Sequence, residues 1–192
     1  MAGPKILIIP GSMRTGSHNV KLAAAAAHAF AQAGVQVTRI SLADFPLPIY
    51  DADLQAKSGV PKHAINLKRM MGTHHGILIV TPEYNASVPA LVKNTIDWIT
   101  RVQDPHESRG QVFRERAFAI ASASQSRLGG SRALAALRLI LSACHAAVIP
   151  SQLALSFADQ AYDDRDRLKH PSDIEAMGAL VRQLVEFSQR MV

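Results

Sequence analysis

The chain has 192 residues, which is enough for one well-buried domain and short for two, and no low-complexity linker divides it. Hydrophobic residues make up 48% and charged residues 19%, a composition typical of a folded globular protein that excludes disorder. Because we find neither an apolar stretch long enough to cross a bilayer nor a signal peptide, we expect a single domain over residues 1–192, in the cytoplasm and not inserted in a membrane.

The net charge of +6 favours anionic partners. The basic residues are spread along the chain and only 5% of residues are aromatic, which leaves few platforms for stacking bases. We therefore expect no nucleic-acid partner and favour a small phosphorylated ligand. Cys144, the single cysteine, lies in an apolar segment, and we interpret it as a small core residue and not as a nucleophile.

Apolar runs and helix-forming stretches alternate along the chain. In chain order, the sequence predicts strand 5–9, helix 19–33 ending at Gly34, strand 35–41, helix 61–71 with Pro61 in its first turn, strand 76–80, helix 89–100, strand 117–121, a helix ending near residue 143, strand 146–149 and helix 172–191. Ser172 and Glu175 form a capping-box pattern at the start of the last helix. Five repeats of strand then helix predict an α/β fold, a three-layer sandwich around a five-stranded parallel sheet.

Three polar loops each follow an apolar strand. They are "GSMRTGSHN" at residues 11–19, "TPEYNASVP" at 81–89 and "SASQSRLGGS" at 122–131. The carboxyl ends of parallel strands meet at one edge of the sheet, where ligands bind in folds of this kind. We therefore expect the three loops to form one pocket.

The first loop has the chemistry of a phosphate site. Ser12 and Ser17 supply hydroxyl groups, Asn19 an amide and Arg14 a guanidinium, and the loop leads into a helix whose amino terminus favours an anion. It lacks the lysine of a P-loop and the three spaced glycines of a dinucleotide fold, so a terminal monophosphate fits better than ATP or a pyrophosphate. The alternative that it is only a polar turn, with Ser17 as the helix N-cap, stays open.

The three loops in this order, with "PEYNASVPALVKNTIDWITR" as the middle motif and "SQSRLGGSR" after the fourth strand, resemble the NADPH-dependent FMN reductase family of flavodoxin-like proteins. That family includes quinone, azo-dye and chromate reductases. The resemblance runs from Lys5 to about Leu141 by motif. Ala86 and residues 125–127 depart from the pattern, because the family usually has glycine after the asparagine and often glycine or proline in the third loop.

The resemblance implies FMN as cofactor and NAD(P)H as co-substrate. It places Ser12, Arg14, Ser17 and Asn19 at the FMN phosphate and ribityl oxygens. It places the second loop, Pro82, Glu83, Tyr84 and Asn85, along the isoalloxazine ring, and Ser122 and Ser124 of the third loop on the other side of that ring. Glu83, Tyr84 and Arg101 are candidates for the nicotinamide side.

Several of these residues have simpler interpretations. Trp98 lies on an apolar helix face and is expected in the core, while Asp97 and Arg101, four residues apart, form either a helical ion pair or part of a subunit contact. The adjacent His74 and His75 have no spaced carboxylate or thiol partner, so we predict no metal site.

The resemblance implies an enzyme that reduces quinones, azo compounds, chromate or free flavin by two electrons with ping-pong kinetics. No catalytic side chain is required, because FMN carries the chemistry. Two alternatives are an electron carrier of the flavodoxin kind, which is typically acidic, and a flavin-binding redox sensor without significant turnover. The resemblance also implies a homodimer or homotetramer, and we predict that the apolar, proline-rich segment 42–55 contributes to the subunit contact.

Overall fold

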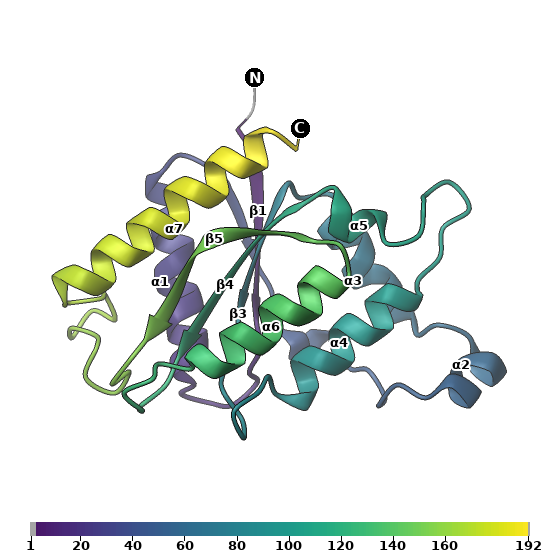
Figure 1. The fold of residues 1–192 in the computed structure, drawn as a ribbon, viewed down its shortest axis with the longest axis horizontal. Helices are drawn as coiled ribbons and strands as arrows, with labels where there is room; N and C mark the ends of the chain where they lie inside the picture. Colours follow the sequence, from purple (N-terminus) through teal and green to yellow (C-terminus); the bar gives the residue numbers. More distant parts are fainter. Residues whose placement is uncertain (1–2, 192) are drawn as a thin grey trace.

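The computed structural model describes residues 3–191, so residues 1, 2 and 192 at the ends of the predicted domain lie outside the described part. Its centre is a sheet of five parallel strands in the order β2-β1-β3-β4-β5, which confirms the predicted sheet (Figure 1). The strands are β1 (Lys5–Pro10), β2 (Gln36–Arg39), β3 (Gly76–Val80), β4 (Ala117–Ala123) and β5 (Ala147–Leu155).

Helices cover both faces of this sheet, as Figure 1 shows. They are α1 (His18–Gln32), α2 (Ala52–Ser58), α3 (Lys62–Gly72), α4 (Ala90–Arg101), α5 (Gln111–Arg114), α6 (Ser131–Ala143) and α7 (Pro171–Gln189), with a 3-10 turn at Leu42–Asp44. Helices α1 and α7 pack on the face that carries Ile6 and Ile8, whereas α3, α4 and α6 pack on the face that carries Leu7 and Ile9.

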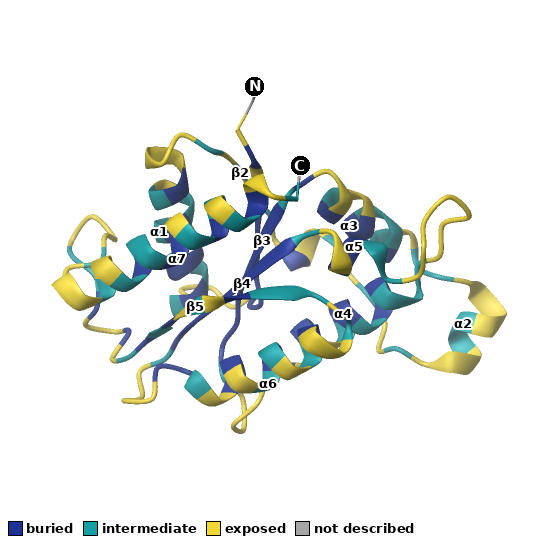
Figure 2. Cartoon of the chain, turned by 45° about the horizontal axis from the view of Figure 1, so that its top comes forward, coloured by how far each residue is buried: buried dark blue, intermediate teal, exposed yellow. Residues whose placement is uncertain are grey.

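Burial follows the predicted pattern of strands covered on both sides. Every residue of β3 and β4 is buried, and the strands form the buried centre of Figure 2. Such continuous apolar runs are typical of the central strands of a parallel sheet, which have helices on both faces. Helix α2 behaves differently, because it contains no buried residue and extends away from the sheet.

Some local predictions need correction. The sequence predicts no helix in the segment at 42–55, but this segment contains the 3-10 turn and the start of α2. The N-cap of α2, Asp51, accepts a hydrogen bond from the backbone N–H of Leu54 at 2.7 Å. The capping box at the last helix is wrong, because α7 begins with Pro171 at its first position and its N-cap, His170, makes no side-chain cap bond. Pro61 is the N-cap of α3 and not part of its first turn.

Strand β5 runs to Leu155 and is much longer than predicted. Its register against β4 shifts between Phe118 and Ile120, where the edge strand bulges around Pro150. Proline has no backbone N–H to continue a ladder, which explains why apolar patterning alone placed the end of the strand at this point.

Candidate active site

The three polar loops meet at the carboxyl edge of the sheet, where they form a cleft of about 430 Å³. The cleft lies beside the switch point between β1 and β3, where the chain order of the strands reverses. It is lined by Ser12, Arg14, Ser17, His18, Asn19, Pro82, Glu83, Tyr84, Ala123, Ser124 and Gln125. Most of the residues predicted for the cofactor site are therefore brought together.

In the first loop, Ser17 is the N-cap of α1 and its hydroxyl accepts from the backbone N–H of Asn19 at 3.3 Å. The Ser12 hydroxyl accepts from the backbone N–H of Arg14 at 3.3 Å, and the Arg14 guanidinium lies on the exposed side of the loop, where it donates to the carbonyls of Thr15 and Gly16. The first turn of α1 contains no acidic residue. No acidic side chain of this turn therefore opposes an anion at the positive end of the helix.

Asn19 has a structural function in addition to its place in the cleft. Its side chain is buried, accepts from the backbone N–H of Ala123 at 2.9 Å and donates to the carbonyl of the same residue at 2.9 Å. The Asn19 amide thereby satisfies the backbone N–H and C=O of the last residue of β4, as a residue of a neighbouring strand would. Most of its hydrogen-bonding capacity is used within the protein.

The second loop turns sharply at Asn85 and Ala86, which both have positive φ, at 50° and 63°. Two backbone hydrogen bonds between Tyr84 and Ser87, at 2.9 and 3.0 Å, close this turn. Tyr84 is 54% exposed and borders the cleft, whereas Asn85 is exposed at the tip of the turn and does not line it.

The Glu83 carboxylate joins the second loop to α6. Its side chain is 7% exposed and accepts from the backbone N–H groups of Arg132 and Ala133 at 3.1 and 3.2 Å and from Nε of Arg132 at 2.7 Å. Burial alone would raise the pKa of Glu83, but the bonds from Arg132 and Ala133 and the charge of Arg132 together lower the pKa below its ordinary value. Glu83 is therefore held as a carboxylate that caps α6.

In the third loop, Ser124 lines the cleft and its hydroxyl bonds with that of Ser126 at 3.1 Å. Ser122, by contrast, faces the α6 side of the sheet, where its hydroxyl is fully buried without a hydrogen-bond partner and lies directly against Gly130. The structure therefore does not bring Ser122 to the cleft.

The structure also places Arg101 outside the cleft. Its guanidinium lies over the ring of Tyr50, 4.8 Å from the ring centre, in the segment that precedes α2. Asp97 pairs with Lys93 at 2.8 Å and not with Arg101. Trp98 is fully buried, as predicted, and its indole N–H donates to the carbonyl of Pro48 at 2.7 Å.

Sequence reasoning missed His18 and Gln125, which both line the cleft. Each lies inside a loop that was singled out, but neither residue type has a specific association with phosphate or flavin. The signal that would have found His18 was its position as the first residue of α1, where side chains border an anion bound at the helix end.

His74 and His75, for which the sequence predicts no metal site, have hydrogen-bond partners within the protein. His74 is buried and contacts the carbonyl of Met70 at 2.7 Å and the hydroxyl of Thr38 at 2.9 Å, while Nδ1 of His75 accepts from the backbone N–H of Lys5 at 3.0 Å. Within residues 3–191, no group of three or more histidine, cysteine or acidic side chains has the spacing of a metal site. Cys144 is half-buried at the end of α6, and burial raises the pKa of its thiol.

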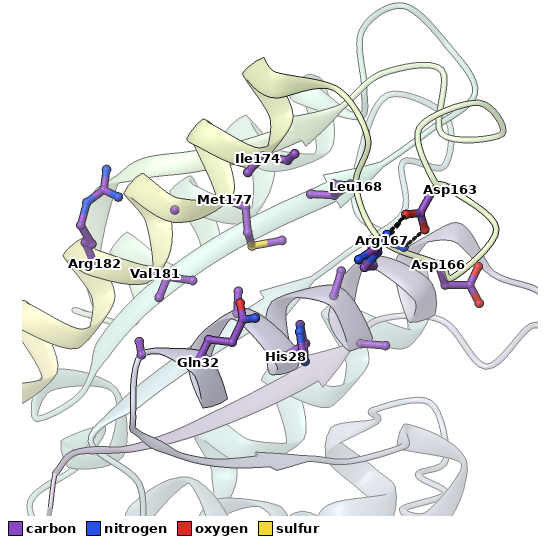
Figure 3. Close-up of a pocket in the computed structure, with 15 residues that line it drawn as sticks. His28, Gln32, Asp163, Asp166, Arg167, Leu168, Ile174, Met177, Val181 and Arg182 are labelled. Atoms are coloured by element: carbon purple, nitrogen blue, oxygen red, sulfur yellow. Dashed lines mark hydrogen bonds and ion pairs between the residues drawn. The ribbon is translucent and has the colours of Figure 1, made fainter.

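A larger groove, of about 840 Å³, lies between α1 and α7. Figure 3 shows Met177 and Val181 of α7 facing His28 and Gln32 of α1 across it. The acidic groups of its lining are already paired, Asp163 with Arg167 and Asp166 with Lys21, each at 2.8 Å. The smaller cleft is the better candidate for an active site, because the three polar loops meet there beside the switch point of the sheet.

The fold defines a flavodoxin-like protein, and the cleft contains hydroxyl groups, a guanidinium and a helix end that suit a phosphorylated ligand. Residues 4–160 match the family model described as NADPH-dependent FMN reductase. A quinone reductase of Escherichia coli is 37% identical over 138 residues, covering 71% of this chain and 69% of that protein. An NAD(P)H-dependent FMN reductase of Pseudomonas aeruginosa is 35% identical over 167 residues, covering 85% and 84% of the two chains.

Solved structures of the same fold include FerB, a flavoenzyme NAD(P)H:(acceptor) oxidoreductase from Paracoccus denitrificans. It has a TM-score of 0.80, 23% sequence identity and coverage of 98% of both chains. An azoreductase from Bacillus anthracis has a TM-score of 0.57 and 15% identity, over 99% of this chain and all of that one. The chain belongs to the NADPH-dependent FMN reductase family, as the resemblance of its loops implied. In the part of the chain that the structure describes, none of the helices is both long and apolar enough to traverse a membrane.

Proposed function

We propose that the protein is an FMN-dependent NAD(P)H oxidoreductase that reduces quinones or related acceptors by two electrons. The convergence of three loops on one cleft carries this proposal: serine hydroxyl groups, an exposed guanidinium and a helix end without acidic residues lie together there. This donor set fits a phosphomonoester. The names of the relatives support the choice of acceptor.

Ser12, Ser17 and Arg14 would hold the FMN phosphate, assisted by the backbone N–H groups at the start of α1. Pro82, Glu83 and Tyr84 would line the ring on one side and Ser124 on the other. When bound, FMN supplies the transfer of a hydride equivalent from NAD(P)H to the acceptor. The exposed Tyr84 borders the open side of the cleft, where it would contact co-substrate and acceptor in turn. Because the co-substrate must leave this opening before the acceptor enters it, we expect ping-pong kinetics.

Within this proposal, Glu83 serves the site through α6. Its carboxylate fixes the second loop against the start of the helix that follows the third loop, so two walls of the cleft keep their spacing. It holds no proton to donate near neutral pH, because its pKa is lowered. We therefore assign it a positioning role and not one as a general acid.

We also propose that residues 1–192 act as a single cytoplasmic domain in a homodimer or homotetramer. Two core clusters on the same sheet support the single domain. Ile49, in the predicted contact segment, is 72% exposed and supports burial by a second copy. The size of the particle in solution, measured by light scattering, tests the assembly.

The test is an absorption titration with FMN, followed in the same cuvette by NADPH without oxygen and then by a quinone. We expect saturable binding, bleaching by NADPH and steady NADPH consumption with parallel double-reciprocal plots. Arg14→Ala should weaken FMN binding about 10-fold or more and riboflavin binding little, because riboflavin lacks the phosphate. Arg69→Ala, on the exposed side of α3, is the matched control. Tight FMN binding without NADPH consumption would instead support the electron carrier or the sensor.

A further inference from the structure

A separate pocket of about 490 Å³ lies beyond the carboxyl end of β2, and we call it the β2 pocket. Strand β2 pairs with β1 only as far as Arg39, opposite Ile8, whereas β1 continues to Pro10. The lining of the β2 pocket includes Ser12, Arg39, Ile40, Ser41, Asp44 and Phe45. Ser12 also lines the cleft, so the two spaces adjoin at the first loop.

The β2 pocket offers hydrogen-bond donors to an anion. Arg39 is exposed, and among residues 3–191 no acidic side chain lies within ion-pair distance of its guanidinium. The hydroxyl groups of Ser12 and Ser41 each accept a hydrogen bond from a backbone N–H, at 3.3 and 3.2 Å, so each keeps its own hydrogen to donate. A guanidinium with two hydroxyl groups suits a phosphate.

The same pocket has an apolar wall. Phe45 is half-buried, and its ring lies edge-on to the ring of His63, with 6.2 Å between the ring centres. Ile40 and Met70 add apolar surface beside it. A flat base can stack on an aromatic ring of this kind. The lining therefore suits a ligand that combines a base with a phosphate, and the volume is in the range of small-molecule sites.

We propose that the β2 pocket binds the adenosine half of NADPH, and that Arg39 binds its 2′-phosphate and so makes NADPH preferred over NADH. The inference rests on the proposed function, because the nicotinamide half must reach the FMN cleft. Since the two spaces adjoin at Ser12, one dinucleotide can place its nicotinamide at the cleft and its adenosine in the β2 pocket. NADH has a hydroxyl group where NADPH has this phosphate, so only NADPH gains the charged contact with Arg39.

The first test compares the two co-substrates in steady-state kinetics with a quinone. Arg39→Ala should lower kcat/KM for NADPH about 10-fold and that for NADH less than about twofold, because hydrogen bonds between charged groups are the strong ones. The loss should lie in KM, since the 2′-phosphate is remote from the transferred hydride. Arg39→Lys keeps the charge and should lose less. Arg109→Ala is the matched control, because Arg109 is exposed and lies outside the β2 pocket.

A second test measures binding without turnover. The FMN complex is titrated in a calorimeter with adenosine 2′,5′-bisphosphate and, separately, with 5′-AMP. Bound FMN occupies the first loop, so the β2 pocket is the expected site for both probes. Wild type should bind the bisphosphate about 10-fold more tightly than 5′-AMP, whereas Arg39→Ala should bind the two about equally.

Equal losses with NADPH and NADH in Arg39→Ala would overturn the inference, as would equal binding of the two probes by wild type. A wild type that prefers NADH would also overturn it, and would favour Asp44 as an acceptor for ribose hydroxyl groups. Failure of wild type to oxidise NADPH, with Arg39-dependent binding of the bisphosphate intact, would instead overturn the proposed function and support the β2 pocket as an adenosine phosphate site.

Discussion

The side chain of Glu83 is only 7% exposed, and its carboxylate accepts hydrogen bonds from the backbone at the start of α6. Glu83→Gln should lower the free energy of unfolding by about 1–3 kcal/mol at pH 7, since charge-assisted bonds are stronger than neutral ones. Chemical denaturation measures this difference. Glu186→Gln removes a comparable but exposed pair with Arg190 and should cost less than about 0.5 kcal/mol.

The difference in unfolding free energy between wild type and Glu83→Gln should depend on pH. Because folding lowers the pKa of Glu83, its stabilisation is present above the pKa of the unfolded chain and is lost as pH falls through the folded pKa. The difference in unfolding free energy between wild type and Glu83→Gln should therefore shrink below about pH 4. A difference that is constant from pH 7 to pH 3 would show that the charge of Glu83 contributes nothing.

Ala86 occupies a left-handed backbone conformation that costs a side-chain-bearing residue about 1–2 kcal/mol relative to glycine. Part of the gain from glycine is lost to its greater freedom in the unfolded chain. Ala86→Gly should therefore raise the free energy of unfolding by up to about 1 kcal/mol, and Ala86→Val should lower it. Equal stabilities for the two variants in thermal melts would argue against strain in this turn.

At the scale of elements, the loop after β4 depends on the close approach of Gly130 to Ser122. Both Gly130 and Gly16 have positive φ, but a Cβ at Gly130 would overlap the Ser122 hydroxyl, whereas one at Gly16 would meet nothing within 4 Å. Gly16→Ala should cost about 1 kcal/mol from backbone strain alone, and Gly130→Ala clearly more. Denaturant midpoints of the two variants measure this, and equal losses would exclude a packing contribution.

Helix α4 holds the segment that leads into α2. Asn94 accepts from the backbone N–H of Tyr50 at 2.8 Å and donates to the carbonyl of Pro48 at 2.9 Å. Asn94→Ala should speed hydrogen exchange at the Tyr50 amide at least 10-fold, since its acceptor is lost, while exchange in β3 stays unchanged. Lys93→Ala, which removes only an exposed pair, is the control. Unchanged exchange at Tyr50 would mean that other contacts hold the segment.

At the scale of the whole molecule, much of the fold was predictable because β1, β3 and β4 are continuous apolar runs. The place of the first loop in the cleft was also predictable, since the loop combines hydroxyl groups and an arginine with the start of a helix, and these groups suit an anion. The buried orientation of Ser122 was not predictable, because it depends on the face that β4 turns toward α6. The partners of Glu83 and Arg101 were hidden for a similar reason, since they come from elements distant in sequence.

Strand β5 forms one border of the sheet. The bulge around Pro150 leaves few backbone N–H and C=O groups on its outer side for hydrogen bonds to another strand. Arg138 donates to the carbonyl of Ile149 at 3.0 Å, and the N–H of Ser151 donates to the side chain of Gln183 at 2.7 Å. An incoming strand from another molecule would find these groups occupied, which protects the protein against edge-to-edge aggregation. Two copies of this chain are therefore not expected to associate by pairing their β5 borders.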